Sequence, residues 1–203
     1  MTHSRIDDAT TPGDDPMEIL VAYDSTRWIC LPPSWPHRGH DDARSWVAAT
    51  VRDVCTRSLG TTRANKRWLT RTLECLAGWQ DEDELKYLYL PSITSEFLLL
   101  RIQYAFCQGD RDELLRGLVL TSDLDVLEPP LLHEVVADGL GAGVGGVVDA
   151  HVAGELTAMA ISAFRSGPFD LRITCELGDP VNVPQLLPVV DDFIDGISVV
   201  RAE

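Results

Sequence analysis

The stretch Phe169-Asp-Leu-Arg-Ile-Thr-Cys-Glu-Leu177 decides the predicted fold, because its apolar and polar residues alternate throughout. Successive side chains of a β-strand point to opposite faces of the sheet. A period of 2 therefore predicts a strand with one face on the core. The expected inward residues are Phe169, Leu171, Ile173, Cys175 and Leu177, and the expected outward residues are Asp170, Arg172, Thr174 and Glu176.

Two more strands are predicted directly before this one, at 144–152 and 156–164. The segments that connect the three strands, 153–155 and 165–168, are short. A crossover between parallel strands takes about a dozen residues. The three strands should therefore form an antiparallel meander.

The same alternation recurs in 98–106, where Arg101 and Gln103 lie between apolar residues that should face the core. A strand at 85–90 precedes it. Strand-like segments also occur at both ends of the chain, at 19–23, 28–31 and 197–199.

Apolar residues at helical spacing predict two amphipathic helices in the first half. Asp41 and Asp42 can cap the first, which ends near Gly60, and Thr62 can cap the second, at 63–77.

Two more helices are predicted in the second half, at 110–120 and 184–194. Because a proline inside a helix costs about 3 kcal/mol, we expect the last helix to start nearer Pro188 than Pro184.

These elements predict an α+β fold: a central antiparallel β-sheet, largely a meander, with amphipathic helices on one face. We expect residues 17–203 to form a single domain, because one core can serve a chain of this length. Residues 1–16 are rich in Asp, Thr and Pro without apolar periodicity, which predicts a disordered acidic tail.

The net charge and the cysteines limit the class of protein that the chain can belong to. The chain has 32 acidic and 17 basic residues, a net charge of −15, which disfavours nucleic acid as a partner. The N-terminal segment is neither a secretory signal nor an anchor, and no run of about 18 apolar residues follows, so we expect no membrane association. The odd, widely spaced cysteines predict buried thiols and a reducing, cytoplasmic location: Cys30, Cys55, Cys75, Cys107 and Cys175.

The basic residues are concentrated in one part of the chain. Residues 38–71 contain eight basic and three acidic residues, a net charge of +5 that leaves −20 elsewhere. Four of them share one side of the second predicted helix: Arg63, Lys66, Arg67 and Arg71. This face is either solvated, with Asp or Glu partners elsewhere, or a binding surface for an acidic protein partner or a second copy of the chain.

Gly141, Gly143 and Gly146 satisfy the G-x-G-x-x-G pattern of dinucleotide sites. Such a site needs a helix after the glycines, whereas Val147 begins strand-like alternation. We interpret the glycines as a flexible turn between strands, and we expect no cofactor.

Histidines supply the other candidate chemistry. His37, His40 and Asp41 could hold a divalent ion, although a solvated loop leading into a helix cap explains the same residues. His151 shares a strand face with Asp149, which is a common arrangement of solvent-facing residues. An enzyme that uses His37, His40 or His151 is therefore the alternative hypothesis.

The segment Trp28-Ile-Cys-Leu31-Pro32-Pro33-Ser-Trp35 resembles the opening of the PsbP/Mog1-like α+β group. The resemblance implies an antiparallel sheet flanked by helices and, for many members, accessory or protein-binding roles. It carries over no functional residues. Together with the basic helix face, it favours a non-catalytic accessory or protein-interaction module that binds another protein or itself.

Overall fold

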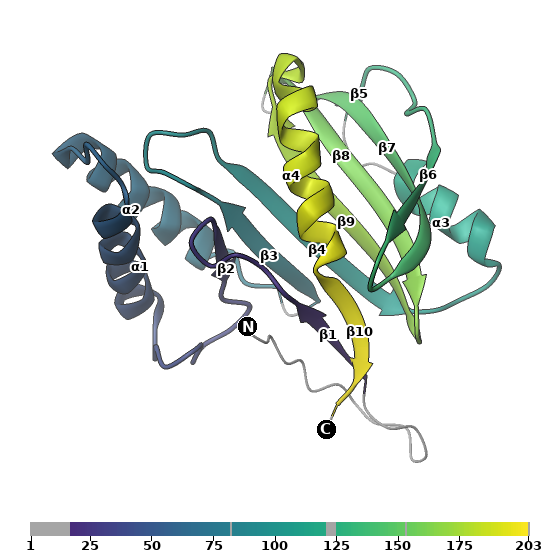
Figure 1. Ribbon diagram of the computed structural model, residues 1–203, viewed down its shortest axis with the longest axis horizontal. Helices are drawn as coiled ribbons and strands as arrows, with labels where there is room; N and C mark the ends of the chain where they lie inside the picture. Colours follow the sequence, from purple (N-terminus) through teal and green to yellow (C-terminus); the bar gives the residue numbers. More distant parts are fainter. Residues whose placement is uncertain (1–16, 82, 121–124, 153, 203) are drawn as a thin grey trace. The chain divides into compact units, whose positions relative to one another are not determined.

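The computed structural model describes residues 17–81, 83–120, 125–152 and 154–202, and it shows an α+β protein (Figure 1). The predicted tail, 1–16, lies outside the described residues. In chain order the elements are β1 (Met17–Val21), β2 (Trp28–Leu31), α1 (Ala43–Arg57), α2 (Arg63–Ala77), β3 (Glu84–Tyr89), β4 (Leu98–Phe106), α3 (Arg111–Leu120), β5 (Asp125–Val126), β6 (His133–Ala137), β7 (Gly141–Val152), β8 (Glu155–Ser166), β9 (Phe169–Gly178), a 3₁₀ turn (Pro180–Asn182), α4 (Val183–Asp195) and β10 (Ile197–Arg201).

The chain divides into two compact units. The helical-hairpin unit is Asp24–Arg101, and the meander unit comprises the described residues up to Tyr23 and from Ile102 onward. The expectation of a single domain stays a prediction. No helix in the described part of the chain is long and apolar enough to cross a membrane.

In the helical-hairpin unit, α1 and α2 pack over a strand pair in which β2 and β3 are antiparallel. Both predicted caps are confirmed: the Asp42 carboxylate accepts from the Ser45 backbone N–H at 2.7 Å, and the Thr62 hydroxyl accepts from that of Asn65 at 3.1 Å. The core of this unit joins apolar residues of both helices and the strands: Ile29, Leu31, Trp46, Val47, Val51, Val54, Leu69, Leu73, Ala77, Leu88, Leu90, Ile93 and Leu99.

In the meander unit, β7, β8 and β9 form the predicted meander, and both of its pairings are antiparallel. Strands β5 and β6 each pair with β7, and the terminal strand β10 pairs antiparallel with β1. The predicted antiparallel α+β fold is therefore confirmed. The pairing of β1 with β10 joins segments from opposite ends of the sequence, which local patterns do not reveal.

Helices cover both faces of the meander, not one. Leu115 and Val119 of α3 pack against β7 and β8 on one face. On the other face, α4 lies over Val147 and Ala160, whose side chains point away from α3. The sheet is therefore the middle layer of three.

Three residues depart from the predicted exposure, and the burial of Thr174 follows from the covering of the face beneath α3. Asp170 and Thr174, expected to face solvent, are 5% and 3% exposed. Thr174 lies opposite Ile161, a residue of the core beneath α3. Phe106, expected inward, is 55% exposed at the end of β4.

The glycine-rich segment is part of strand β7, so its interpretation as a turn was wrong. A side chain at Gly143 would clash with the Ala163 carbonyl oxygen and the Phe164 ring. A Cβ at Gly145 would lie 2.7 Å from the Val135 side chain. Neighbouring groups approach this strand too closely for larger residues.

Helix α4 begins at Val183 and contains Pro188, so the expected later start was also wrong. The preceding 3₁₀ turn already gives the chain a helical path, and Pro184 occupies the first turn, where a missing N–H is tolerated. The burial of Val190, Phe193 and Ile194 stabilises the helix beyond Pro188.

Candidate functional site

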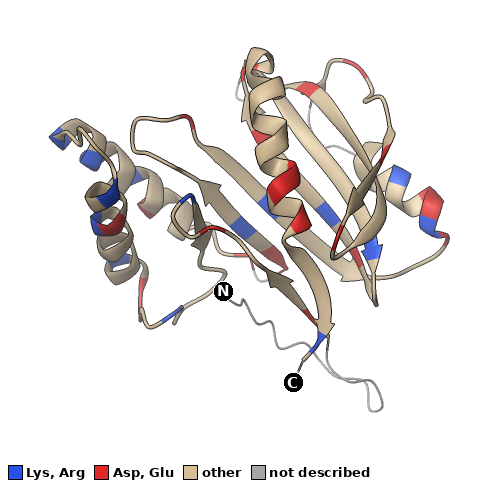
Figure 2. Ribbon diagram, viewed as in Figure 1, with Lys and Arg blue, Asp and Glu red and all other residues tan. Residues whose placement is uncertain are grey.

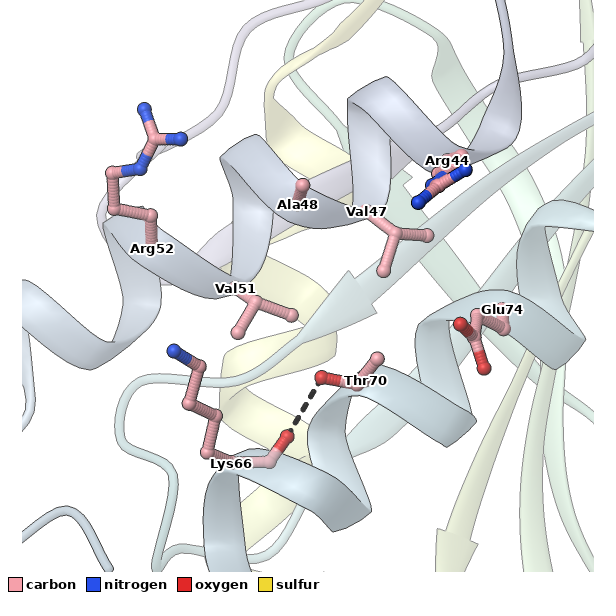
Figure 3. Close-up of a pocket in the computed structure, with 8 residues that line it drawn as sticks. All are labelled: Arg44, Val47, Ala48, Val51, Arg52, Lys66, Thr70 and Glu74. Carbon is pink, nitrogen blue, oxygen red and sulfur yellow. Dashed lines mark hydrogen bonds between the residues drawn. The ribbon is translucent and has the colours of Figure 1, made fainter. Parts of the chain in front are cut away.

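A groove of about 420 Å³ lies between α1 and α2 in the helical-hairpin unit (Figure 3). Its lining residues come from both helices: Arg44, Val47, Ala48, Val51, Arg52, Lys66, Thr70 and Glu74. Val47 and Val51 are buried and point from α1 toward α2, so they form an apolar floor (Figure 3). The hydroxyl of Thr70 donates to the Lys66 carbonyl at 2.8 Å.

The rim of this groove is basic. Arg44, Arg52 and Lys66 are exposed, and Glu74 is the acidic residue of the lining. None of the three basic side chains lies within ion-pair distance of an acidic residue in the described ranges. Arg57, in contrast, pairs with Asp53 at 3.7 Å, and its guanidinium donates to backbone carbonyls.

Two of the rim charges, those of Arg44 and Lys66, also lie where the helix dipole disfavours a cation. The N-terminal end of a helix carries partial positive charge and favours acidic residues. Arg44 lies in the first turn of α1, and Lys66 lies near the start of α2. Neither helix has an acidic residue in its first turn. The dipoles therefore do not account for the placement of these cations, although the charge of Arg44 contributes to lowering the pKa of Asp42, the cap of α1.

The four predicted partner-binding residues are all exposed on α2. Of these, Lys66 lines the groove, whereas Arg63, Arg67 and Arg71 extend the basic surface along the helix. Sequence reasoning missed Arg44 and Arg52. Their spacing of eight residues puts them on one side of α1, and that signal could have found them.

The predicted metal site gains no support from the geometry. His37 and His40 are held together by two backbone hydrogen bonds of 2.9 Å. Burial, Arg38 and His40 together lower the pKa of His37 to about 4, which keeps its ring neutral. Asp41 is exposed. In the described ranges no three His, Cys, Asp or Glu side chains gather as metal ligands.

His151 lies on exposed strand surface beside Asp149, as the alternation predicted. It belongs to the meander unit, whereas His37 and His40 belong to the helical-hairpin unit. The structure thus assembles no site from the three histidines within either unit.

The prediction that every cysteine faces inward was wrong. Cys30 and Cys175 are buried, Cys55 and Cys107 are half-buried, and Cys75 is exposed. Cys75 falls between Leu73 and Ala77 on α2, so the helical rotation turns it away from the core. Burial raises the pKa of the Cys175 and Cys107 thiols, which disfavours the nucleophilic thiolate.

Comparisons with known proteins yield a distant structural likeness. No protein-family model and no curated protein matches the chain. The crystal structure of LpqN, a protein involved in cell envelope biogenesis of Mycobacterium tuberculosis, is similar with a TM-score of 0.48 and 10% identity. The likeness covers 93% of this chain and 87% of LpqN.

Proposed function

We propose that this protein is a non-catalytic interaction module whose α1–α2 groove binds an acidic, amphipathic segment of a partner protein. The observation that carries the proposal is a basic rim above an apolar floor, whose three cations have no ion-pair partner among the described residues. Arg44, Arg52 and Lys66 keep their charges available although the whole chain has a net charge of −15.

The geometry of the groove defines the partner segment. An amphipathic helix binds a groove by placing its apolar stripe on the floor and its charged flanks on the rim. Ala48, exposed beside the buried Val47 and Val51, offers the apolar contact, and Arg52 and Lys66 offer cations from opposite helices. Exposed ion pairs contribute about 0.2–1 kcal/mol each. The charges therefore serve mainly to select an acidic partner.

A labelled probe peptide tests this proposal. The probe is an amphipathic helical peptide with leucines on one face and glutamates on both flanks, and binding is followed by fluorescence anisotropy. The double variant Arg52→Glu/Lys66→Glu should weaken binding by about tenfold or more, because two attractive charge contacts become repulsive. Arg67→Glu is the matched control on α2 and should have a much smaller effect, since Arg67 does not line the groove.

Two results would contradict the proposal. One is the absence of saturable binding to the wild type, and the other is equal affinity of the wild type and the double variant. A probe with glutamine in place of glutamate separates charge selection from simple apolar adhesion.

We include in the same proposal the cellular location of the protein and the kinds of partner that it binds. A reducing cytoplasm fits five free cysteines, and the net charge of −15 supports a protein partner over nucleic acid. Binding to a second copy would use the acidic surface of that copy, and light scattering over a range of concentrations would detect it. The PsbP/Mog1-like resemblance stays a prediction.

A further inference from the structure

We propose that a second groove, beneath α4 in the meander unit, binds a small organic cation: a protonated amine that carries an apolar group. This groove has a volume of about 340 Å³ and lies between α4 and the face of β6, β7 and β8. Pockets for small molecules span about 300–1,000 Å³. The size therefore fits a compact ligand.

Small residues beneath α4 create the space. Val147 lies opposite Ala160, and Gly145 lies opposite Ser162, in the pairing of β7 with β8. Ala160 and Ser162 line the groove together with the buried ring of Phe164. This floor suits an aliphatic or aromatic group of a ligand, and the Ser162 hydroxyl adds one hydrogen-bonding group.

Two carboxylates of α4 give the groove its negative charge. Asp191 and Asp195 both line it and are separated by one helical turn. Figure 2 shows the acidic residues along this helix. The Asp195 carboxylate accepts a hydrogen bond of 3.4 Å from the Asp138 backbone N–H, which helps to orient it. His133 of β6 is the third titratable residue of the lining.

These carboxylates are placed against local stability. The C-terminal end of a helix carries partial negative charge, and Asp195 is the last residue of α4. No basic residue lies in the last turn. Partial burial, and then the charge of Asp195, raise the pKa of Asp191. A bound cation would relieve both the repulsion between the carboxylates and their conflict with the dipole.

The same groove favours an organic cation over a metal ion. In the described part of the chain, no group of three potential metal ligands exists. The ammonium group needs only hydrogen bonds to carboxylate oxygens, and apolar side chains surround most of the remaining space. The apolar part of the ligand would contact Phe164 and the α4 residue Leu187.

Titration with 2-phenylethylamine, followed by ¹⁵N–¹H correlation NMR, tests the proposal. The amine should cause saturable shifts at the amides of Val147, Ser162 and Asp191. The neutral analogue 2-phenylethanol and the anion phenylacetate should bind more weakly by about tenfold or more, because hydrogen bonds to charged groups are the strong ones.

Isosteric variants make the test specific. Asp191→Asn should weaken amine binding by about tenfold, whereas Asp192→Asn, on the same helix but outside the groove, should leave it nearly unchanged. Dispersed spectra of both variants verify folding. The proposal fails if the groove amides show no saturable shift, if the alcohol binds as well as the amine, or if Asp191→Asn binds like the wild type.

Discussion

The two grooves have the same construction with opposite charge. The groove of the helical-hairpin unit has a valine floor and a rim of Arg44, Arg52 and Lys66. The groove of the meander unit has an apolar floor and a rim that includes Asp191 and Asp195. In each, some of these charges lie near the helix end whose dipole disfavours them: Arg44 and Lys66 near the starts of α1 and α2, and Asp195 at the end of α4. Charges that oppose folding in this way are more easily explained by binding than by stability.

A buried charge outside the grooves shows the opposite arrangement. Asp170 accepts from the Arg165 guanidinium at 2.6 and 3.0 Å, and Arg165 also donates to the carbonyls of Gln108 and Gly109. Every hydrogen bond of this cluster lies within the meander unit. Here the charges are paired, and their role is structural.

The largest expected effect follows from breaking this cluster. Asp170→Asn should lower the free energy of unfolding by about 3 kcal/mol, because it removes a charged acceptor and leaves Arg165 poorly compensated. Urea denaturation measures the change, with Asp192→Asn as the exposed control. A loss similar to that of the control would show that the cluster is not structural.

A smaller loss is expected at the strand that borders both α3 and α4. Gly143→Ala should cost about 1–3 kcal/mol, because the new methyl group would meet the Ala163 carbonyl and the Phe164 ring. Gly154→Ala is an informative contrast: that turn has space for a Cβ but a positive φ of 86°. Thermal unfolding of both variants separates close packing from backbone strain. A tolerated alanine at Gly143 would contradict the close approach.

The sequence predicted what depends on local periodicity. Alternation located the meander strands and their order, and capping residues located α1 and α2. Thr174 was misplaced because its burial depends on a second helical layer. Asp170 was misplaced because it is buried in contacts with Arg165 and the Gln108 backbone. No local pattern encodes either arrangement. Gly141 and Gly143 conceal the start of β7, since without side chains they show no alternation.

Only part of the candidate site could be predicted from the sequence, for the same reason. Helical spacing was enough to place Lys66 on a basic face. The groove also needs Arg44 and Val47 from a different helix, and helix packing brings these residues to Lys66. The α4 groove was not foreseen, because it depends on which side chains of β7 and β8 lie beneath the helix.

A stabilising change should be found on the basic surface of α2, beside the groove. Arg63→Glu replaces a cation with an anion at the first residue of α2, so it should raise the free energy of unfolding by about 0.3–1 kcal/mol. Urea denaturation at low ionic strength measures this gain. Added salt should reduce it, and a loss of stability would indicate that the basic residues support the fold.

The smallest expected change in the free energy of unfolding concerns Asp191. It is also the most direct test of whether a charge in a groove opposes folding. Partial burial and then the charge of Asp195 raise the pKa of this carboxyl in the folded state, whereas His133 acts to lower it. Folding therefore favours the protonated form, and stability associated with Asp191 is lost as the pH rises through its folded-state pKa. An asparagine side chain at this position does not ionise and would carry no such penalty.

The decisive measurement is the free energy of unfolding of wild type and Asp191→Asn at pH 7 and at a pH below the ordinary Asp value of 3.8. The variant should be more stable than the wild type at pH 7, and the difference should vanish in acid. A variant that is less stable at pH 7, or a difference that grows in acid, would contradict the claim that the grooves keep their charges for binding.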